Sequence, residues 1–236
     1  MTIPATYDIN LKEKPGGALD YIAFQRPEIG KSVFMSGYRQ HYKYFCAFRD
    51  WINNHIFSVS ARREQALKNF GLPSLADQIV VHVRRGDYAH HRHLFSLLPV
   101  ASDRYYVEAL KKVVTESGMQ KAIIFCEQES REDVRTTLLP ILKQAVPDVD
   151  ISLAPTRGSA GKEHTAWHEM LWMSTATAFV IANSSFSWWA AWFSSAATDK
   201  KVVTFPKEWM GLAYDGVSEM AVPQGFGLWL PVSNFR

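Results

Sequence analysis

The stretch Ile181-Ala-Asn-Ser-Ser-Phe-Ser-Trp-Trp-Ala-Ala-Trp-Phe193 passes from apolar residues through small polar ones into a run of tryptophans. It predicts a buried strand end, a turn, and a helix that begins with serines. The first N–H groups of a helix have no partner inside it, and the helix dipole adds partial positive charge there. The turn is therefore a candidate phosphate site. The alternative is a well-capped core helix whose tryptophans only pack.

Strands and helices alternate on both sides of this turn. Such alternation predicts an α/β fold with a doubly wound parallel sheet. The predicted strands cover residues 78–83, 121–125, 149–153, 179–182 and 201–205. The predicted helices cover residues 61–70, 103–115, 131–144, 163–175 and 185–196, with Ser102 or Asp103 as the cap of the second.

Polar segments follow three of the predicted strands, at residues 82–87, 126–129 and 183–187. Ligands of doubly wound sheets bind outside the carboxyl ends of the strands. The positions of these segments therefore indicate one shared site.

The first of these segments is His82-Val-Arg-Arg-Gly-Asp-Tyr88. The guanidinium groups of Arg84 and Arg85 match phosphate oxygens in pairs and stay charged at any working pH. Asp87 is placed to orient an arginine or to accept a hydroxyl proton. The alternatives are a surface Arg–Asp pair and, for His82, a purely structural histidine within the strand.

The serine turn and the helix before it supply further candidates. Asn183, Ser184, Ser185 and Ser187 are expected to cap the helix or to offer their backbone amides to a ligand. Glu169, in Trp167-His-Glu-Met-Leu-Trp-Met173, is expected either to bind a ribose or base or to face solvent.

The N-terminal third is less regular and rich in aromatic residues. Phe45, Phe48, Trp51 and Ile52 recur at helical spacing, which predicts a helix that packs on an apolar surface. We divide the chain into an N-terminal segment of residues 1–75 and a domain of residues 76–236.

Composition limits the classes of function. Of 236 residues, 47% are hydrophobic and 21% charged, as in globular proteins, and a net charge of +3 argues against a dedicated nucleic-acid binder. The two cysteines, Cys46 and Cys126, lie among apolar residues and are expected to be buried free thiols, which favours a reducing cytosol.

Other sequence signals are missing. No signal peptide starts at Met1, and no apolar run approaches the ~20 residues of a membrane span. The histidines of the segment 90–93 lack the spacing of a metal site, so we interpret them as part of a mobile basic loop near the substrate. Neither a P-loop nor a Gly-x-Gly-x-x-Gly motif occurs.

Two motifs in this order, His82-Val-Arg-Arg-Gly-Asp-Tyr88 and Ala182-Asn-Ser-Ser-Phe-Ser-Trp-Trp-Ala-Ala-Trp192, resemble the α-1,2-fucosyltransferases of glycosyltransferase family 11. The stretch Gly37-Tyr-Arg-Gln-His-Tyr-Lys-Tyr-Phe45 is similar to a third motif of that family. The likeness covers roughly residues 35–232. Single residues that also match are Asp103, Tyr105, Tyr106, Pro206, Trp209, Pro223 and Trp229.

The resemblance implies a GT-B-like glycosyltransferase fold. It also implies GDP-fucose as donor, a galactose-terminated glycan as acceptor, and transfer to the galactoside 2-hydroxyl with inversion. No metal and no cofactor beyond the donor are implied.

By the same resemblance, Arg85 or Arg84 contacts the donor diphosphate, with His82 beside it. Arg85 and Asp87 are the expected catalytic residues, Asp87 as a candidate base. The turn of Asn183, Ser184, Ser185, Phe186 and Ser187 supplies N–H groups. Glu127, after the middle strand, replaces an acidic pair that relatives use for guanine. Glu169 stands where relatives usually have Asp.

One departure from the family pattern concerns the N-terminus. Only 36 residues precede Gly37, and the family's Gly-Gly-Leu-Gly-Asn-Gln-type motif is absent, so we expect a reduced N-terminal, acceptor-side lobe. The alternatives are a fucosyltransferase of another linkage and a non-catalytic module that binds a GDP-sugar or glycan. We expect a cytoplasmic protein; the alternative is a lumenal fragment of a Golgi membrane protein.

Overall fold

The main sheet has six strands, all parallel, in the spatial order β5-β4-β3-β6-β7-β8. It is seen in a computed structural model that describes residues 9–12, 33–36, 42–86, 99–195, 198–209, 223 and 225–234. The strands are β3 (Ile79–Val83), β4 (Lys121–Cys126), β5 (Asp150–Leu153), β6 (Ala178–Val180), β7 (Val202–Pro206) and β8 (Leu228–Val232). The predicted α/β class with a parallel sheet is confirmed.

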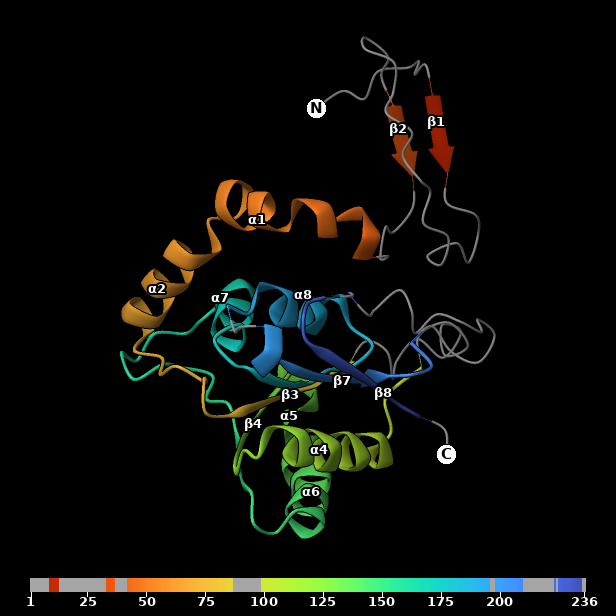
Figure 1. Cartoon of the computed structure of the whole chain (residues 1–236). Helices are drawn as coiled ribbons and strands as arrows, with labels where there is room; N and C mark the ends of the chain where they lie inside the picture. Colours follow the sequence, from red (N-terminus) through yellow and green to blue (C-terminus); the bar gives the residue numbers. More distant parts are fainter. Residues whose placement is uncertain are drawn as a thin grey trace.

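Helices cover both faces of this sheet (Figure 1). One face carries α4 (Asp103–Ser117) and a continuous helical stretch of α5 (Arg131–Asp133), a π-helical turn (Val134–Leu138) and α6 (Leu139–Ala145). The other face carries α2 (Val59–Phe70), α7 (Ala166–Met173) and α8 (Ser185–Phe193). The sheet is therefore doubly wound, as expected.

Short elements complete the described chain. Strands β1 (Ile9–Lys12) and β2 (Val33–Ser36) form a separate parallel pair. The remaining helical pieces are turns at Tyr42–Tyr44, Cys46–Phe48, Gln128–Ser130 and Thr198–Lys200, α1 (Arg49–Trp51) and a π-helical turn at Ile52–Ile56. No helix among the described residues is long and apolar enough to cross a membrane.

Two differences from the predicted elements concern α7 and β8. The helix expected from residue 163 begins at Ala166, because Thr165 and His168 form a capping box there. Strand β8, which contains Pro231, was not among the predicted strands. A proline lacks the N–H of a sheet ladder, and β8 is an edge strand, where that loss is tolerated.

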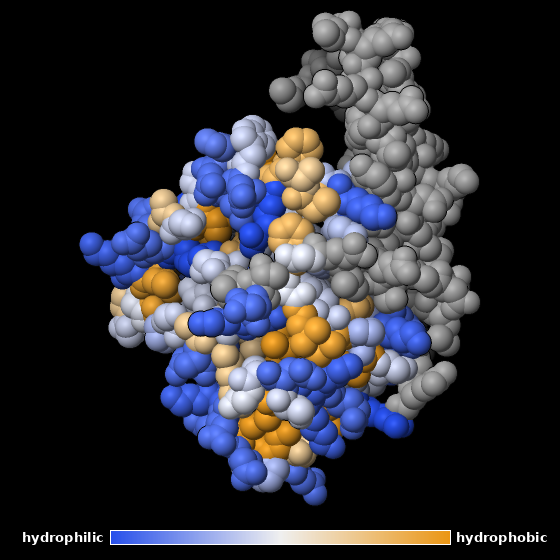
Figure 2. Space-filling model, in the orientation of Figure 1, coloured by the Kyte–Doolittle hydropathy of each residue, from blue (hydrophilic) through white to orange (hydrophobic). Residues whose placement is uncertain are grey.

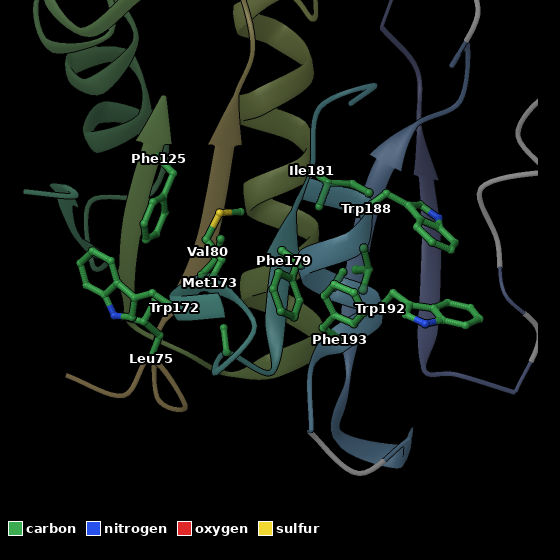
Figure 3. Packing of buried hydrophobic residues seen from close by; sticks show 14 of the residues in the cluster. Leu75, Val80, Phe125, Trp172, Met173, Phe179, Ile181, Trp188, Trp192 and Phe193 are labelled. Carbon is green, nitrogen blue, oxygen red and sulfur yellow. The ribbon is translucent and has the colours of Figure 1, made fainter. Parts of the chain in front are cut away.

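Alternate residues of the central strands belong to two separate hydrophobic cores, because successive side chains of a strand point to opposite faces of the sheet. In β3, Ile79 and Val81 pack with the α4 side, whereas Val80 packs with α7 and α8. Figure 3 shows Val80 in the latter cluster with Phe125 and Phe179 from β4 and β6. This alternation also determines where the polar residues after β3 point.

The tryptophans of α8 belong mainly to the core, in agreement with their expected packing role. The rings of Trp188 and Trp192 are buried and stack with centroids 5.0 Å apart. Trp189 is half-buried and contacts Phe45, at 5.1 Å between centroids. Large aromatic rings of this kind account for much of the apolar area buried on this face.

The predicted N-terminal helix is only partly right. Residues 42–56 form consecutive 3₁₀, α and π turns, which do not keep one face in register. Ile52 is buried, but the side chains of Phe48 and Trp51 are 61% and 55% exposed, so the expected packing of these two is wrong. Figure 2 shows other hydrophobic residues at the surface as separate groups among hydrophilic ones.

The part of the N-terminal segment from residue 42 onward packs against the sheet domain. Val59 and Ala66 of α2 lie in the same core as Trp172 of α7. The indole N–H of Trp172 also donates a hydrogen bond to the Pro73 carbonyl, at 2.7 Å. The division of the chain at residue 75 stays a prediction.

Three cations bind the backbone carbonyls at the carboxyl end of α8. Arg49 donates to the carbonyls of residues 192 and 194, at 2.9 and 3.1 Å, and Arg63 to that of residue 193, at 2.6 Å. Lys201 donates to the carbonyls of residues 191 and 194, at 3.2 and 3.3 Å. These bonds engage the last carbonyls of α8 and the carbonyl that follows it, and they hold α8 in place. The carbonyl of residue 191 also accepts the N–H of Ser194.

Stability is expected to depend on pH through Lys201. Burial, and then the charges of Arg49 and Arg63, lower the pKa of Lys201 to about 7 from an ordinary value of 10.5. Between these two values the unfolded chain binds more protons than the folded protein. The free energy of unfolding should therefore rise with pH from about 7 to about 10.5. In Lys201→Met, denaturant titrations should show a smaller rise across this window; parallel curves would contradict the assignment.

Candidate functional site

The polar segments after β3, β4 and β6 meet at one edge of the sheet. From β3 the chain moves outward through β4 and β5, then returns to place β6 on the other side of β3. The order therefore reverses between β3 and β6, where open α/β sheets bind ligands. Val81 pairs with Val180 and Val83 with Cys126, so the three strands end close together.

A pocket of about 470 Å³ opens at this edge. Its volume lies within the range of small-molecule sites. It is lined by residues at the carboxyl ends of β3 and β4, by residues after β6 and by the first turn of α7: His82, Arg84, Cys126, Glu127, Ala166, Glu169, Ser184, Ser185 and Phe186. Seven of the residues expected at a donor site are thus brought together.

The two consecutive arginines point to opposite faces of the sheet. Arg84 lines the pocket, and its Nε lies 2.9 Å from Oε1 of Glu127 across the end of β4. Arg85 turns toward the α4 face, where its guanidinium binds Asp103 and, at 2.5 Å, Asp133. Of these two arginines only Arg84 lines the pocket, so the structure does not support the catalytic role expected for Arg85.

Arg85 instead clamps the end of β3 to the starts of two helices. Burial lowers the pKa of Arg85, but the hydrogen bonds to Asp133 and Asp103 outweigh it and raise the pKa. The guanidinium also lies 6.0 Å from the ring centroid of Tyr106. This arrangement is suited to hold the loop that carries Arg84.

We expect Arg85→Ala to destabilise the protein by about 1–3 kcal/mol, the range for lost hydrogen bonds to charged groups. The two carboxylates would lose a shared partner that is mostly buried, with 16% of its side chain exposed. Thermal and denaturant unfolding would measure the change. Arg135→Ala, which removes a pair with Glu132 at the surface, is the control and should have little effect. Equal stability of Arg85→Ala and wild type would contradict the clamp.

His82 forms part of the pocket wall as a neutral ring. Burial, and then the positive charge of Arg84, lower the pKa of His82 to about 3. Its ring packs on that of Phe186, with centroids 5.3 Å apart. Within the described part of the chain, His82 Nδ1 has no hydrogen-bond partner. A ligand in the pocket would find there a buried nitrogen that is uncharged near neutral pH.

The first turn of α8 presents its backbone to the pocket. Ser184 is the N-cap residue, and its side chain makes no capping hydrogen bond, so the cap predicted for Ser184 is wrong. Ser184, Ser185 and Phe186 line the pocket. The N–H groups that open a helix have no acceptor inside it, so this turn is arranged to receive an anion.

Asn183 and Ser187 support the turn from behind and do not line the pocket. Asn183 donates to the carbonyls of Pro99 and Trp209, at 2.8 and 3.3 Å. Ser187 is fully buried and donates to the carbonyl of Ser184, at 3.2 Å. These contacts hold the backbone of the turn, and the donor contact expected of the two residues stays a prediction.

Glu169 faces the pocket, which excludes the solvent-facing alternative for this residue. It lies in the first turn of α7, and its side chain is 30% exposed. Burial raises the pKa of Glu169 to about 7, against an opposing effect of Arg131. Glu169 therefore gains or loses a proton near neutral pH. Perturbed carboxyl groups in a cleft are common at functional sites.

Cys126 and Ala166 are pocket residues that sequence reasoning did not select as ligand contacts. Cys126 is the last residue of β4, and its position at a strand end was the available signal. Burial raises the pKa of its thiol to about 11, so it is protonated at neutral pH. Both cysteines are free, as expected, but each is half-buried and not fully buried.

Two expectations fall outside the described residues. Asp87, the candidate base, and the histidine-rich segment 90–93 both lie there. Among the residues that the structure does describe, no group of three or more His, Cys, Asp or Glu side chains is placed to hold a metal ion.

Comparison with known proteins identifies the family. The sequence matches the profile of Glycosyl transferase family 11 over residues 18–210. The chain belongs to glycosyltransferase family 11. This confirms the resemblance seen in the motifs after β3 and at the start of α8.

Two Escherichia coli proteins are similar to this family 11 chain. An alpha-1,2-colitosyltransferase is 24% identical over 178 residues, which are 75% of this chain and 56% of that protein. The O-antigen biosynthesis glycosyltransferase WbnK is 28% identical over 134 residues, 57% of this chain and 39% of that protein. The chain thus matches about half the length of these relatives.

Solved structures of POFUT1 are more distant. The complex with GDP-fucose is 11% identical and aligns with 63% of this chain and 46% of that chain, at a TM-score of 0.39. A complex with GDP aligns with 63% and 47% of the two chains, at 12% identity and a TM-score of 0.38.

Proposed function

We propose that this family 11 chain transfers fucose from GDP-fucose to the 2-hydroxyl of a galactoside, with inversion at the sugar's anomeric carbon. One observation carries the proposal: Arg84 and the N-terminus of α8 face the same pocket, from β3 and β6 on either side of the switch point. A fixed guanidinium and a helix N-terminus are two suitable partners for one diphosphate.

The chemistry requires the bond between the sugar and the diphosphate to break while the acceptor oxygen bonds the anomeric carbon. Negative charge then grows on the departing GDP. Arg84 and the amides of Ser185 and Phe186 would stabilise that charge in place, without reorganisation of solvent. Such stabilisation needs no metal ion, and we propose that the enzyme works without one.

The acceptor hydroxyl must also lose its proton. Asp87 remains our proposed base, with the proton passing from the galactoside oxygen to its carboxylate. Glu127, paired with Arg84, and Glu169 would contact the nucleoside part of GDP. Both carboxyl groups line the pocket, and guanine and ribose present N–H and O–H donors to such acceptors.

The colitosyltransferase among the relatives supports a second candidate for the sugar. In that case the same diphosphate site would hold an activated colitose in place of fucose. The pocket side chains that we assign to the diphosphate and nucleoside would keep their roles, and the difference would lie in contacts to the sugar ring.

The test combines binding with turnover. Calorimetry with GDP should show one site, and GDP release should occur from GDP-fucose with a galactoside acceptor, also in the presence of a chelator. Linkage analysis of the product should give the 2-position. Turnover only with activated colitose would favour the second candidate. Binding without turnover of either donor would overturn the enzymatic proposal in favour of a binding module.

A further inference from the structure

His164 is a buried histidine directly behind the pocket wall. Its side chain is 1% exposed and lies against the rings of Phe70 and Trp172, with centroids 6.5 and 5.8 Å away. Its Nε2 lies 3.0 Å from the carbonyl oxygen of Pro155. A carbonyl only accepts hydrogen bonds, so Nε2 carries the hydrogen in this contact.

The other ring nitrogen of His164 faces the pocket carboxyl group. Nδ1 lies 3.3 Å from Oε1 of Glu169. In a neutral ring with its hydrogen on Nε2, Nδ1 is an acceptor, and an ionised carboxylate is also an acceptor. Two acceptors at this distance repel unless a proton lies between them. The geometry therefore favours one proton on the pair, on either partner.

A shared proton changes what Glu169 contributes to an anion site. A lone ionised Glu169 would oppose a diphosphate in the same pocket, in addition to Glu127. With one proton, the pair with His164 carries no net charge in either arrangement. The other groups that act on Glu169 are Arg131, which favours its ionised form, and the Cys126 thiol, which is protonated at neutral pH.

We propose that His164 and Glu169 share one proton, and that His164 is a positioning residue for donor binding. His164 holds the Glu169 carboxyl group against the pocket. The oxygen of Glu169 that does not face His164 can then accept a hydrogen bond from an O–H or N–H group of a nucleoside. The pair does so without adding net negative charge near the diphosphate. The nucleoside part of this inference rests on the proposed function.

The proton itself is tested without any ligand. In long-range proton–nitrogen NMR spectra of ¹⁵N-histidine-labelled protein, His164 Nδ1 should appear as hydrogen-bonded or protonated. In Glu169→Met it should move to the position of a bare acceptor nitrogen. His55, an exposed histidine in the π-helical turn Ile52–Ile56, is the internal reference and should not move. A bare Nδ1 at His164 in the wild type would overturn the shared proton.

The positioning role is tested by a double-mutant cycle on GDP affinity. His164→Phe keeps the ring and removes both nitrogens, and we expect the Kd for GDP to rise about tenfold. Glu169→Met should weaken binding at least as much, and the double variant no further. His55→Phe, at an exposed position in the π-helical turn Ile52–Ile56 that does not line the pocket, is the control and should bind GDP like the wild type.

Additive effects of the two substitutions, or an unchanged Kd in His164→Phe, would overturn the positioning role. Thermal melts of each variant separate these results from a loss of folding. If the wild type does not bind GDP, the proposed function and the nucleoside part of this inference both fall. The NMR result then still decides whether the two residues share a proton.

Discussion

Replacement of Arg84 by alanine should lower turnover by about 100-fold or more while leaving the fold intact. The expectation follows from the loss of a fixed charged donor to the departing diphosphate, for which effects of about 10²–10³ are typical. Arg84 lies at the end of β3 and lines the pocket, and its side chain is 31% exposed, so the core is not disturbed. Turnover of GDP-fucose and the melting temperature should be measured on the same preparations.

Two further variants show whether the loss belongs to the guanidinium itself. Arg84→Ala leaves Glu127 without its ion-pair partner, so the double variant Arg84→Ala/Glu127→Gln removes the unpaired charge as well. It should remain defective. Arg84→Lys keeps the charge but not the planar fork and should be intermediate. Near-normal turnover of Arg84→Ala would refute its role. A large loss of turnover in an Arg85→Ala variant of unchanged stability would indicate instead that Arg85 binds the diphosphate.

Ser185→Asp should weaken GDP binding at least tenfold and at the same time stabilise the unliganded protein. Ser185 is the first residue of α8, is exposed, and lines the pocket. A carboxylate at a helix N-terminus is favoured by the helix dipole, by about 0.3–1 kcal/mol at an exposed site. The same carboxylate would occupy the place of the phosphates and repel them. Calorimetry with GDP and denaturant unfolding without it should therefore change in opposite directions.

The matched control is Ser185→Asn, which has nearly the same shape as the aspartate but no charge. It should bind GDP much more tightly than Ser185→Asp. If the two variants bind GDP equally, the first turn of α8 is not the phosphate site. If Ser185→Asp loses stability, the defect in binding would reflect misfolding, and the role of the helix N-terminus would not be supported.

The sequence was sufficient to predict the parallel sheet and the edge where the site lies. The signals were local: apolar strand segments were followed by polar residues, and the helices had clear periodicity. Such patterns predict secondary structure without knowledge of what packs beside them. The turn before α8 could be interpreted in the same way, because a helix N-terminus has unpaired N–H groups wherever it lies. The tryptophans after it were correctly assigned to packing.

Long-range features could not be predicted in this way. The turns of residues 42–56 and the edge strand β8 depend on what packs beside them. His164 gave no sequence signal as a site residue, because its importance comes from Pro155 and Glu169, which lie on either side of it in space. Similarly, Asn183 donates hydrogen bonds to the carbonyls of Pro99 and Trp209, which are distant in sequence. These bonds hold the turn before α8 in place.

By itself, the sequence determined that two arginines follow one buried strand. It also determined that a serine turn follows a second buried strand and begins a helix. Only the tertiary structure decided which arginine faces the pocket. Successive side chains of a strand point to opposite faces, so one of the two had to meet α8 and the other α4. The choice depended on which helices cover which face of the sheet. That assignment places Arg84 beside the start of α8 and leaves Arg85 bound to Asp103 and Asp133.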